Sequence, residues 1–86
     1  MNERSVVLAS ASGLHARPAA IFVQEAKRFR NQIVVSRGEK TANAKSILSV
    51  LTLGAEQGDR ITLRAEGDDA AAAVDALAAL LERDLG

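Results

Sequence analysis

The chain has 86 residues, enough for one domain with a single core, and we expect that domain to span residues 1–86. It has no cysteine and its only Phe, Tyr or Trp residues are two phenylalanines, which excludes disulfides, thiolate metal sites and cysteine nucleophiles and argues against a stacking surface for nucleic-acid bases. Residues 1–45 carry eight Lys and Arg against three Asp and Glu, and residues 46–86 reverse this ratio, which indicates either a basic face for an acidic partner or a mixed solvated surface.

The N-terminal residues lead into a short apolar run, without the long apolar region of a signal peptide, and no run is long enough to span a membrane. We therefore expect a cytoplasmic protein that does not insert into membranes. A first strand is expected over residues 4–9, because alternation there puts Val6 and Leu8 on one face.

The spacing of apolar residues predicts the remaining elements. Three- and four-residue spacing predicts an amphipathic helix over residues 16–29, and a last helix is expected to be capped by residues 67–69 and to run through Leu85. Period-two alternation predicts strands over residues 32–37, 40–43 and 60–66, and a short apolar helix is expected from the N-cap Ser46 to Gly54. The order βαββαβα indicates an α+β fold, an open-faced two-layer sandwich in which helices cover one face of a four-stranded antiparallel sheet.

Residues 12–20, with the sequence SGLHARPAA, contain the only histidine and the only proline of the chain. Proline is tolerated in the first turn of a helix, so Pro18 places the helix start just before it. His15 then lies at a helix N-terminus, where the unpaired N–H groups of Ala16 and Arg17 attract anions. A phosphoryl group on His15 could be held by those N–H groups and by the guanidinium of Arg17.

Two other interpretations of this segment are open. A lone histidine near a helix start is more often a capping or packing residue than a nucleophile. A zinc site would need carboxylates from elsewhere in the chain, and Arg17 would oppose the cation. The grouping of glycine, histidine, arginine and proline favours phosphate over both, and we expect no metal and no cofactor.

Residues 13–19, GLHARPA, resemble the active-site signature of HPr, the histidine-containing phosphocarrier family of the bacterial sugar phosphotransferase system. Residues 43–54, NAKSILSVLTLG, resemble the regulatory-serine region of that family, and the resemblance extends over essentially the whole chain. It implies that phospho-enzyme I phosphorylates Nδ1 of His15 and that the group then passes to a sugar-specific enzyme IIA. The chain would be a stoichiometric carrier, not an enzyme, and would have the sandwich fold predicted above.

The resemblance also implies a regulatory site and a docking surface. Ser46 would be the target of an ATP-dependent HPr kinase/phosphorylase where one is present, although a serine there can also serve only as an N-cap worth about 1 kcal/mol. The docking surface would comprise the start of the first long helix and the short helix, and maps onto Ala20, Phe22, Val23, Ile47, Leu48 and Leu51. A basic rim of Lys27, Arg28 and Lys45 would steer acidic partners to it. A monomer is expected, because one face must serve several partners.

Two alternative functions remain open on the sequence alone. A regulatory HPr-like module, in nitrogen-related or carbon-catabolite signalling, would act through protein binding and Ser46 without sugar uptake, and the presence of His15 argues against it. An unrelated small ligand-binding or RNA-binding domain would not take up phosphate on His15, and the scarcity of aromatic residues argues against RNA.

Overall fold

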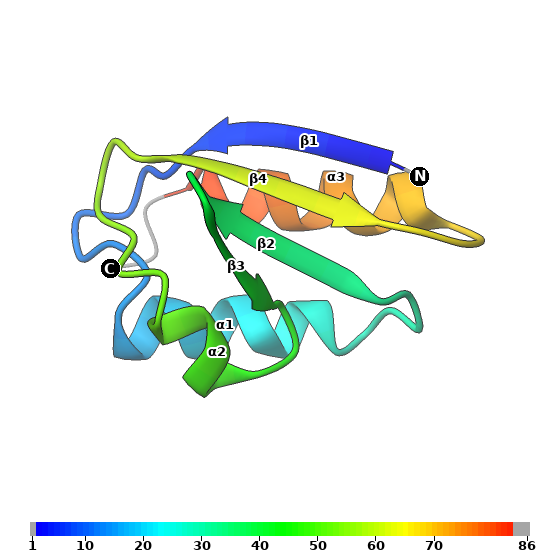
Figure 1. Cartoon of the computed structure of the whole chain (residues 1–86), viewed down its shortest axis with the longest axis horizontal. Coiled ribbons are helices and arrows are strands. Elements are labelled where there is room, and N and C mark those ends of the chain that lie inside the picture. Colours follow the sequence, from blue (N-terminus) through cyan, green and yellow to red (C-terminus); the bar gives the residue numbers. More distant parts are fainter. Residues whose placement is uncertain (1, 84–86) are drawn as a thin grey trace.

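The computed structural model describes residues 2–83 and has the predicted element order. The elements are β1 (Asn2–Val7), α1 (Ala16–Ala26), β2 (Ile33–Arg37), β3 (Lys40–Asn43), α2 (Ile47–Leu51), β4 (Arg60–Ala65) and α3 (Ala70–Leu81). The strands form one antiparallel sheet in the order β1-β4-β2-β3. The helices lie on one side of this sheet, with α2 beside α1 (Figure 1), which confirms the α+β open-faced sandwich.

The register of β4 with its two neighbours explains why one face of the sheet is buried. Ile61 is paired with Val6 of β1, and Leu63 is paired with Val35 of β2, so buried apolar side chains meet across both ladders. The alternate residues of β4 lie on the other face, where the Arg64 guanidinium forms an ion pair of 2.6 Å with Glu3. The alternation read from the sequence therefore assigns both faces correctly.

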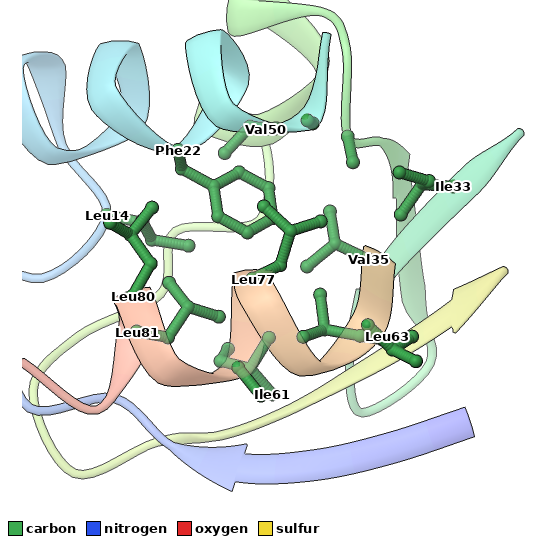
Figure 2. Close-up of a cluster of buried hydrophobic side chains, with 14 of the residues drawn as sticks. Leu14, Phe22, Ile33, Val35, Val50, Ile61, Leu63, Leu77, Leu80 and Leu81 are labelled. Atoms are coloured by element: carbon green, nitrogen blue, oxygen red, sulfur yellow. The ribbon is translucent and has the colours of Figure 1, made fainter. Parts of the chain in front are cut away.

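The core between the sheet and the helices is aliphatic, with Phe22 as its largest buried side chain. Phe22 points from α1 toward Leu77 of α3 (Figure 2), so the two long helices are packed against each other as well as against the strands. The whole predicted stripe of the last helix is buried, namely Ala73, Val74, Leu77, Leu80 and Leu81. Removing the Phe22 ring would cost about 3–5 kcal/mol of unfolding free energy.

The ends of several elements differ from the prediction. The first strand spans Asn2–Val7 because it follows the length of β4, while Leu8 N–H donates instead to the Asp59 carbonyl. The first helix ends at Ala26, after which Phe29 N–H donates to the Ala26 carbonyl in a tighter three-residue turn. The short helix ends at Leu51 and the last strand at Ala65.

The two ends of the last helix also differ. Asp69 occupies the N-cap position, but its φ of 61° is left-handed and its side chain makes no capping hydrogen bond. The helix ends at Leu81, so Glu82 and Arg83 are outside it, and the predicted end at Leu85 lies outside the described residues.

Candidate functional site at the start of α1

His15 is the N-cap residue of α1, so the helix begins where Pro18 predicted. Its backbone is extended (φ −91°, ψ −164°), its carbonyl accepts from Ala19 N–H at 2.8 Å, and its side chain makes no capping bond. Pro18 has no N–H group. Within residues 2–83, the N–H groups of Ala16 and Arg17 have no acceptor. The positive end of the helix is therefore open to an anion.

Gly13 fixes where this helix start lies relative to the rest of the chain. Its φ is 68°, and a Cβ atom at this position would lie 2.5 Å from the carbonyl oxygen of Ala55. The next residue, Leu14, is buried and donates its N–H to the same oxygen at 3.0 Å. Only glycine accommodates both the left-handed backbone and this close approach. The contact brings His15 next to the loop that contains Glu56.

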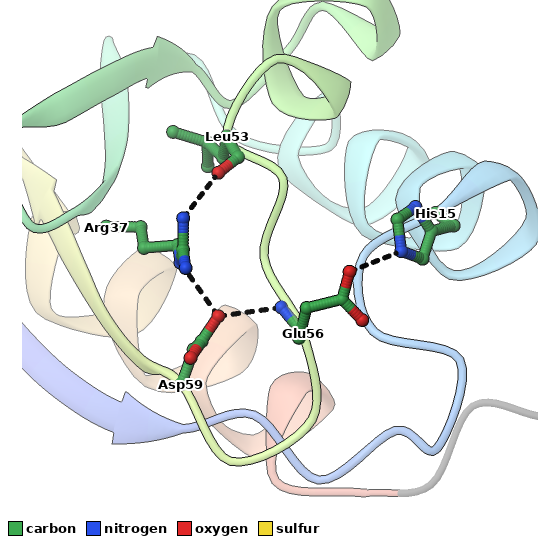
Figure 3. A network of polar contacts seen from close by, with 5 residues as sticks. All are labelled: His15, Arg37, Leu53, Glu56 and Asp59. Atoms are coloured by element: carbon green, nitrogen blue, oxygen red, sulfur yellow. Dashed lines mark hydrogen bonds and ion pairs between the residues drawn. The ribbon is translucent and has the colours of Figure 1, made fainter.

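The His15 imidazole pairs with a carboxylate. Its Nε2 atom lies 3.0 Å from Oε1 of Glu56 (Figure 3), and both side chains are about half exposed, at 54% and 62%. An ionised carboxylate can only accept a hydrogen bond, so the proton of the neutral ring is on Nε2. Nδ1 of this tautomer then carries the lone pair and is the ring atom able to act as a nucleophile.

A second carboxylate holds the loop in place. Asp59 Oδ2 accepts from Glu56 N–H at 2.8 Å and from Nε of Arg37 at 2.7 Å, and Arg37 also donates to the Leu53 carbonyl (Figure 3). The Glu56 N–H group is the main cause that lowers the pKa of Asp59 from its ordinary value, with the Arg37 guanidinium adding to this and partial burial opposing it. The loop that presents Glu56 to His15 is thus fixed by charged groups.

The Arg17 side chain is exposed and forms no hydrogen bond or ion pair with any other residue in the described part of the chain. Its guanidinium is two residues along from His15, on the first turn of the same helix. It is therefore available to an incoming anion, and its role as a phosphate partner stays a prediction.

The predicted docking residues fall into two groups. Leu48 and Ile47, in the first turn of α2, are exposed, at 79% and 41%. The helix α2 lies beside α1 (Figure 1). Leu51 and Ala20 are half-buried. Phe22 and Val23 are core residues, so assigning them to a docking surface is wrong: the stripe that packs α1 on the core cannot also face a partner.

The basic rim is smaller than expected. The Lys27 side chain is exposed and has no partner among residues 2–83, and the exposed Arg28 forms an ion pair of 3.2 Å with Glu25. The ammonium of Lys45, by contrast, donates to the Phe29 carbonyl at 2.6 Å, just beyond the end of α1. Lys45 therefore ties the start of α2 to the end of α1 and has less freedom to reach another protein.

Ser46 is the N-cap of α2. Its Oγ accepts from Ser49 N–H at 3.3 Å, and the Oγ of Ser49 accepts in turn from Asn43 N–H. The serine side chain is half-buried and already engaged in the capping role.

The sequence did not reveal Glu56, Asp59 or Arg37 as parts of this site. Residues 57–59 read as a turn, and Glu56 follows no periodic pattern. Their positions depend on contacts between distant segments, above all the approach of Gly13 to Ala55. A glycine two residues before the histidine was the available signal, since it can mark a close backbone approach, but it does not say which residue is approached.

Two other features are absent from residues 2–83. None of the helices there is long and apolar enough to cross a bilayer. In the same range, no three His, Cys, Asp or Glu side chains gather where they could share a metal ion.

Comparisons with known proteins identify the family of this chain. The family model described as the PTS HPr component phosphorylation site matches residues 2–83. The HPr-like protein Crh of Halalkalibacterium halodurans is 44% identical over 98% of this chain and 100% of its own length. The phosphocarrier protein HPr of Haemophilus influenzae is also 44% identical, over 94% of this chain and 95% of its own length.

Solved structures give the same result. The crystal structure of HPr-C-His from Thermoanaerobacter tengcongensis superposes with a TM-score of 0.91 at 48% identity, covering 95% of this chain and 92% of that one. An HPr dimer from the same organism superposes with a TM-score of 0.77 at 46% identity, covering 100% and 99% of the two chains. The chain described here therefore belongs to the HPr family of phosphocarrier proteins of the phosphotransferase system.

Proposed function

We propose that this chain accepts a phosphoryl group on Nδ1 of His15 from phospho-enzyme I and passes it to an enzyme IIA, in the cytoplasm. The proposal is carried by one observation: an exposed histidine side chain stands beside unpaired N–H groups at the start of α1. His15 is half exposed with Nε2 engaged by Glu56, and the N–H groups of Ala16 and Arg17 are open beside it.

The bonds that form and break in the transfer belong to the His15 ring and the phosphoryl donor. The Nδ1 lone pair attacks phosphorus, the new N–P bond forms, and the bond from phosphorus to the donor's imidazole breaks with its electron pair on the donor nitrogen. The N–H groups of Ala16 and Arg17 and the guanidinium of Arg17 offset the charge of the phosphoryl oxygens. Transfer to enzyme IIA is the same reaction with His15 as the leaving group, so the protein is a carrier turned over by its partners.

The partners would dock on the exposed turn of α2. Leu48 and Ile47 offer apolar area there, and α2 is packed beside the helix that begins at His15. One face used by successive partners favours a monomer, although the Thermoanaerobacter tengcongensis relative is described as a dimer. A mass of one chain in light scattering at micromolar concentration would support the monomer, and a mass of two chains would contradict it.

Ser46 is the proposed regulatory site, for an HPr kinase/phosphorylase. A phosphate there would lie at the N-terminus of α2, where the helix tolerates negative charge, and two residues from the exposed Leu48. Acidic surfaces of partners would then be repelled from α2.

The test is intact mass after incubation with phosphoenolpyruvate and enzyme I, with a brief acid treatment that removes phosphohistidine and leaves phosphoserine. We expect one acid-labile phosphoryl group in the wild type and none in His15→Ala, with the fold of the variant unchanged. No uptake with a cognate enzyme I, or uptake by His15→Ala, would contradict the proposal.

The similarity to Crh keeps the regulatory module as a second candidate. That function predicts phosphate only on Ser46, supplied by a kinase with ATP. The same mass measurement separates the two, because the phosphate would then survive acid and would persist in His15→Ala.

A further inference from the structure

Backbone hydrogen bonds fix the position of the chain near both His15 and Glu56. Glu56 N–H donates to Asp59 Oδ2, and the Glu56 carbonyl accepts from Asp59 N–H at 3.0 Å, so the backbone of this residue is held at both groups. One residue earlier, the Ala55 carbonyl accepts from Leu14 N–H. The carboxylate thus needs only a side-chain rotamer to meet Nε2 at 3.0 Å, which limits the entropy lost in forming the pair.

Phosphorylation changes the charge of the ring that Glu56 faces. The neutral ring attacks through Nδ1 while its proton stays on Nε2. When the N–P bond forms, the ring has gained a bond without losing a proton, so it becomes an imidazolium that carries a phosphoryl group. The positive charge develops at a helix N-terminus and two residues from Arg17, and both of these disfavour it.

We propose that Glu56 is a positioning residue for phosphoryl transfer: its carboxylate holds the proton on Nε2, which keeps Nδ1 as the nucleophile, and offsets the imidazolium charge that forms. This inference rests on the proposed function. The logic is that of a carboxylate behind a histidine in an acid–base pair, where the acid fixes the tautomer and stabilises the charged ring without taking its proton. Among the residues that the structure describes, Glu56 is the one carboxylate in contact with His15.

The same contact acts when the phosphoryl group leaves. A protonated ring departs as neutral imidazole, whereas an unprotonated ring would have to depart as an anion. By holding the proton on Nε2, Glu56 keeps His15 a good leaving group toward the next acceptor. Both directions of transfer therefore depend on the same carboxylate, as a shuttle requires.

Two substitutions separate the two roles. Glu56→Gln keeps an oxygen that can accept from Nε2–H but has no charge, and Glu56→Ala removes both. Glu66→Gln is the matched control, because it makes the same change in net charge at an exposed residue beyond the end of β4 that has no side-chain contact with His15. The two readouts are the ¹⁵N chemical shifts of the ring in the unphosphorylated protein and the rate of phosphoryl transfer from phospho-enzyme I.

We expect the ¹⁵N shifts of the wild type to show Nε2–H with an unprotonated Nδ1, and Glu56→Gln to keep that pattern. Glu56→Ala should move toward a mixture of the two tautomers. The transfer rate should fall about three- to tenfold in Glu56→Gln, since the pair is half exposed but loses water when a partner docks. It should fall further in Glu56→Ala, which loses both roles, and should be unchanged in Glu66→Gln.

The outcomes distinguish this inference from the function on which it rests. If the wild type is phosphorylated and Glu56→Gln transfers at the wild-type rate, the inference is wrong and the carrier function stands. Wild-type ring shifts in Glu56→Ala would likewise contradict it. If the wild type takes up no phosphoryl group, both fail together.

Discussion

The starts of α1 and α2 are two helix N-termini with opposite arrangements, and α2 begins near the end of α1. At α2 the Ser46 side chain accepts from the Ser49 N–H group, so the helix caps itself. At α1 the N-cap is His15, whose side chain turns to Glu56 and leaves the N–H groups of Ala16 and Arg17 open.

The difference teaches how one fold separates a structural helix end from a reactive one. A self-capped end gains stability from its own sequence, because the Ser46 side chain satisfies one of the N–H groups in the first turn of α2, that of Ser49. An open end gives up about that much stability and retains directed donors beside a nucleophile. The α1 end is therefore held from outside, by Gly13 and the Ala55 carbonyl.

The largest loss of stability is expected when the close approach of Gly13 to the Ala55 carbonyl is disturbed. Gly13→Ala places a Cβ atom 2.5 Å from the Ala55 oxygen and must also keep a φ of 68°, so unfolding free energy should fall by about 2–4 kcal/mol. Gly38→Ala is the control, since its φ of 60° is similar but no atom lies within 4 Å of the new Cβ. It should cost only about 1–2 kcal/mol. Urea unfolding measures both, and equal losses would show that the close approach is unimportant.

The next largest effect is expected on the rate of phosphoryl transfer, when Arg17 at the start of α1 loses its charge. Arg17→Gln removes the charge from a side chain that has no other partner in the described residues, so stability should stay within about 0.5 kcal/mol. Transfer to His15 should fall about 10- to 100-fold, because a charge-assisted hydrogen bond to the phosphoryl group is worth about 1.5–3 kcal/mol. Lys27→Gln, on the exposed end of the same helix, controls for net charge. A rate that falls equally in both variants would assign Arg17 to general attraction of partners.

The sequence accounts for the two helix starts to different degrees. Ser46 before an apolar run predicts its own cap, and the cap is present because it is a contact between residues three apart. Pro18 likewise placed His15 at the start of α1. Both are local rules, in which the partner groups are fixed by spacing along one helix.

The rest of the α1 site was not predictable in this way. Glu56 reaches His15 across 41 residues, through a loop contact that no periodic pattern records. Lys45 was expected on an exposed rim but donates to the Phe29 carbonyl, and this depends on where α1 ends, which the apolar spacing overestimated by three residues. Long-range contacts follow from strand register and chain approach, which alternation and helical spacing do not specify.

The smallest effect is expected at the capped start of α2, where two substitutions of Ser46 should separate structure from regulation. Ser46→Ala loses the bond to Ser49 N–H and should cost about 1 kcal/mol in urea unfolding while transfer from enzyme I stays unchanged. Ser46→Asp keeps a capping oxygen and should stay near wild-type stability, but its charge beside Leu48 should slow transfer several-fold by repelling acidic partners. Ala71→Asp adds the same charge at an exposed residue in the first turn of α3, which lies near the end of α1 and far from the starts of α1 and α2, and should transfer at the wild-type rate. If Ser46→Asp also transfers normally, the α2 start is structural only, and the contrast with α1 is complete.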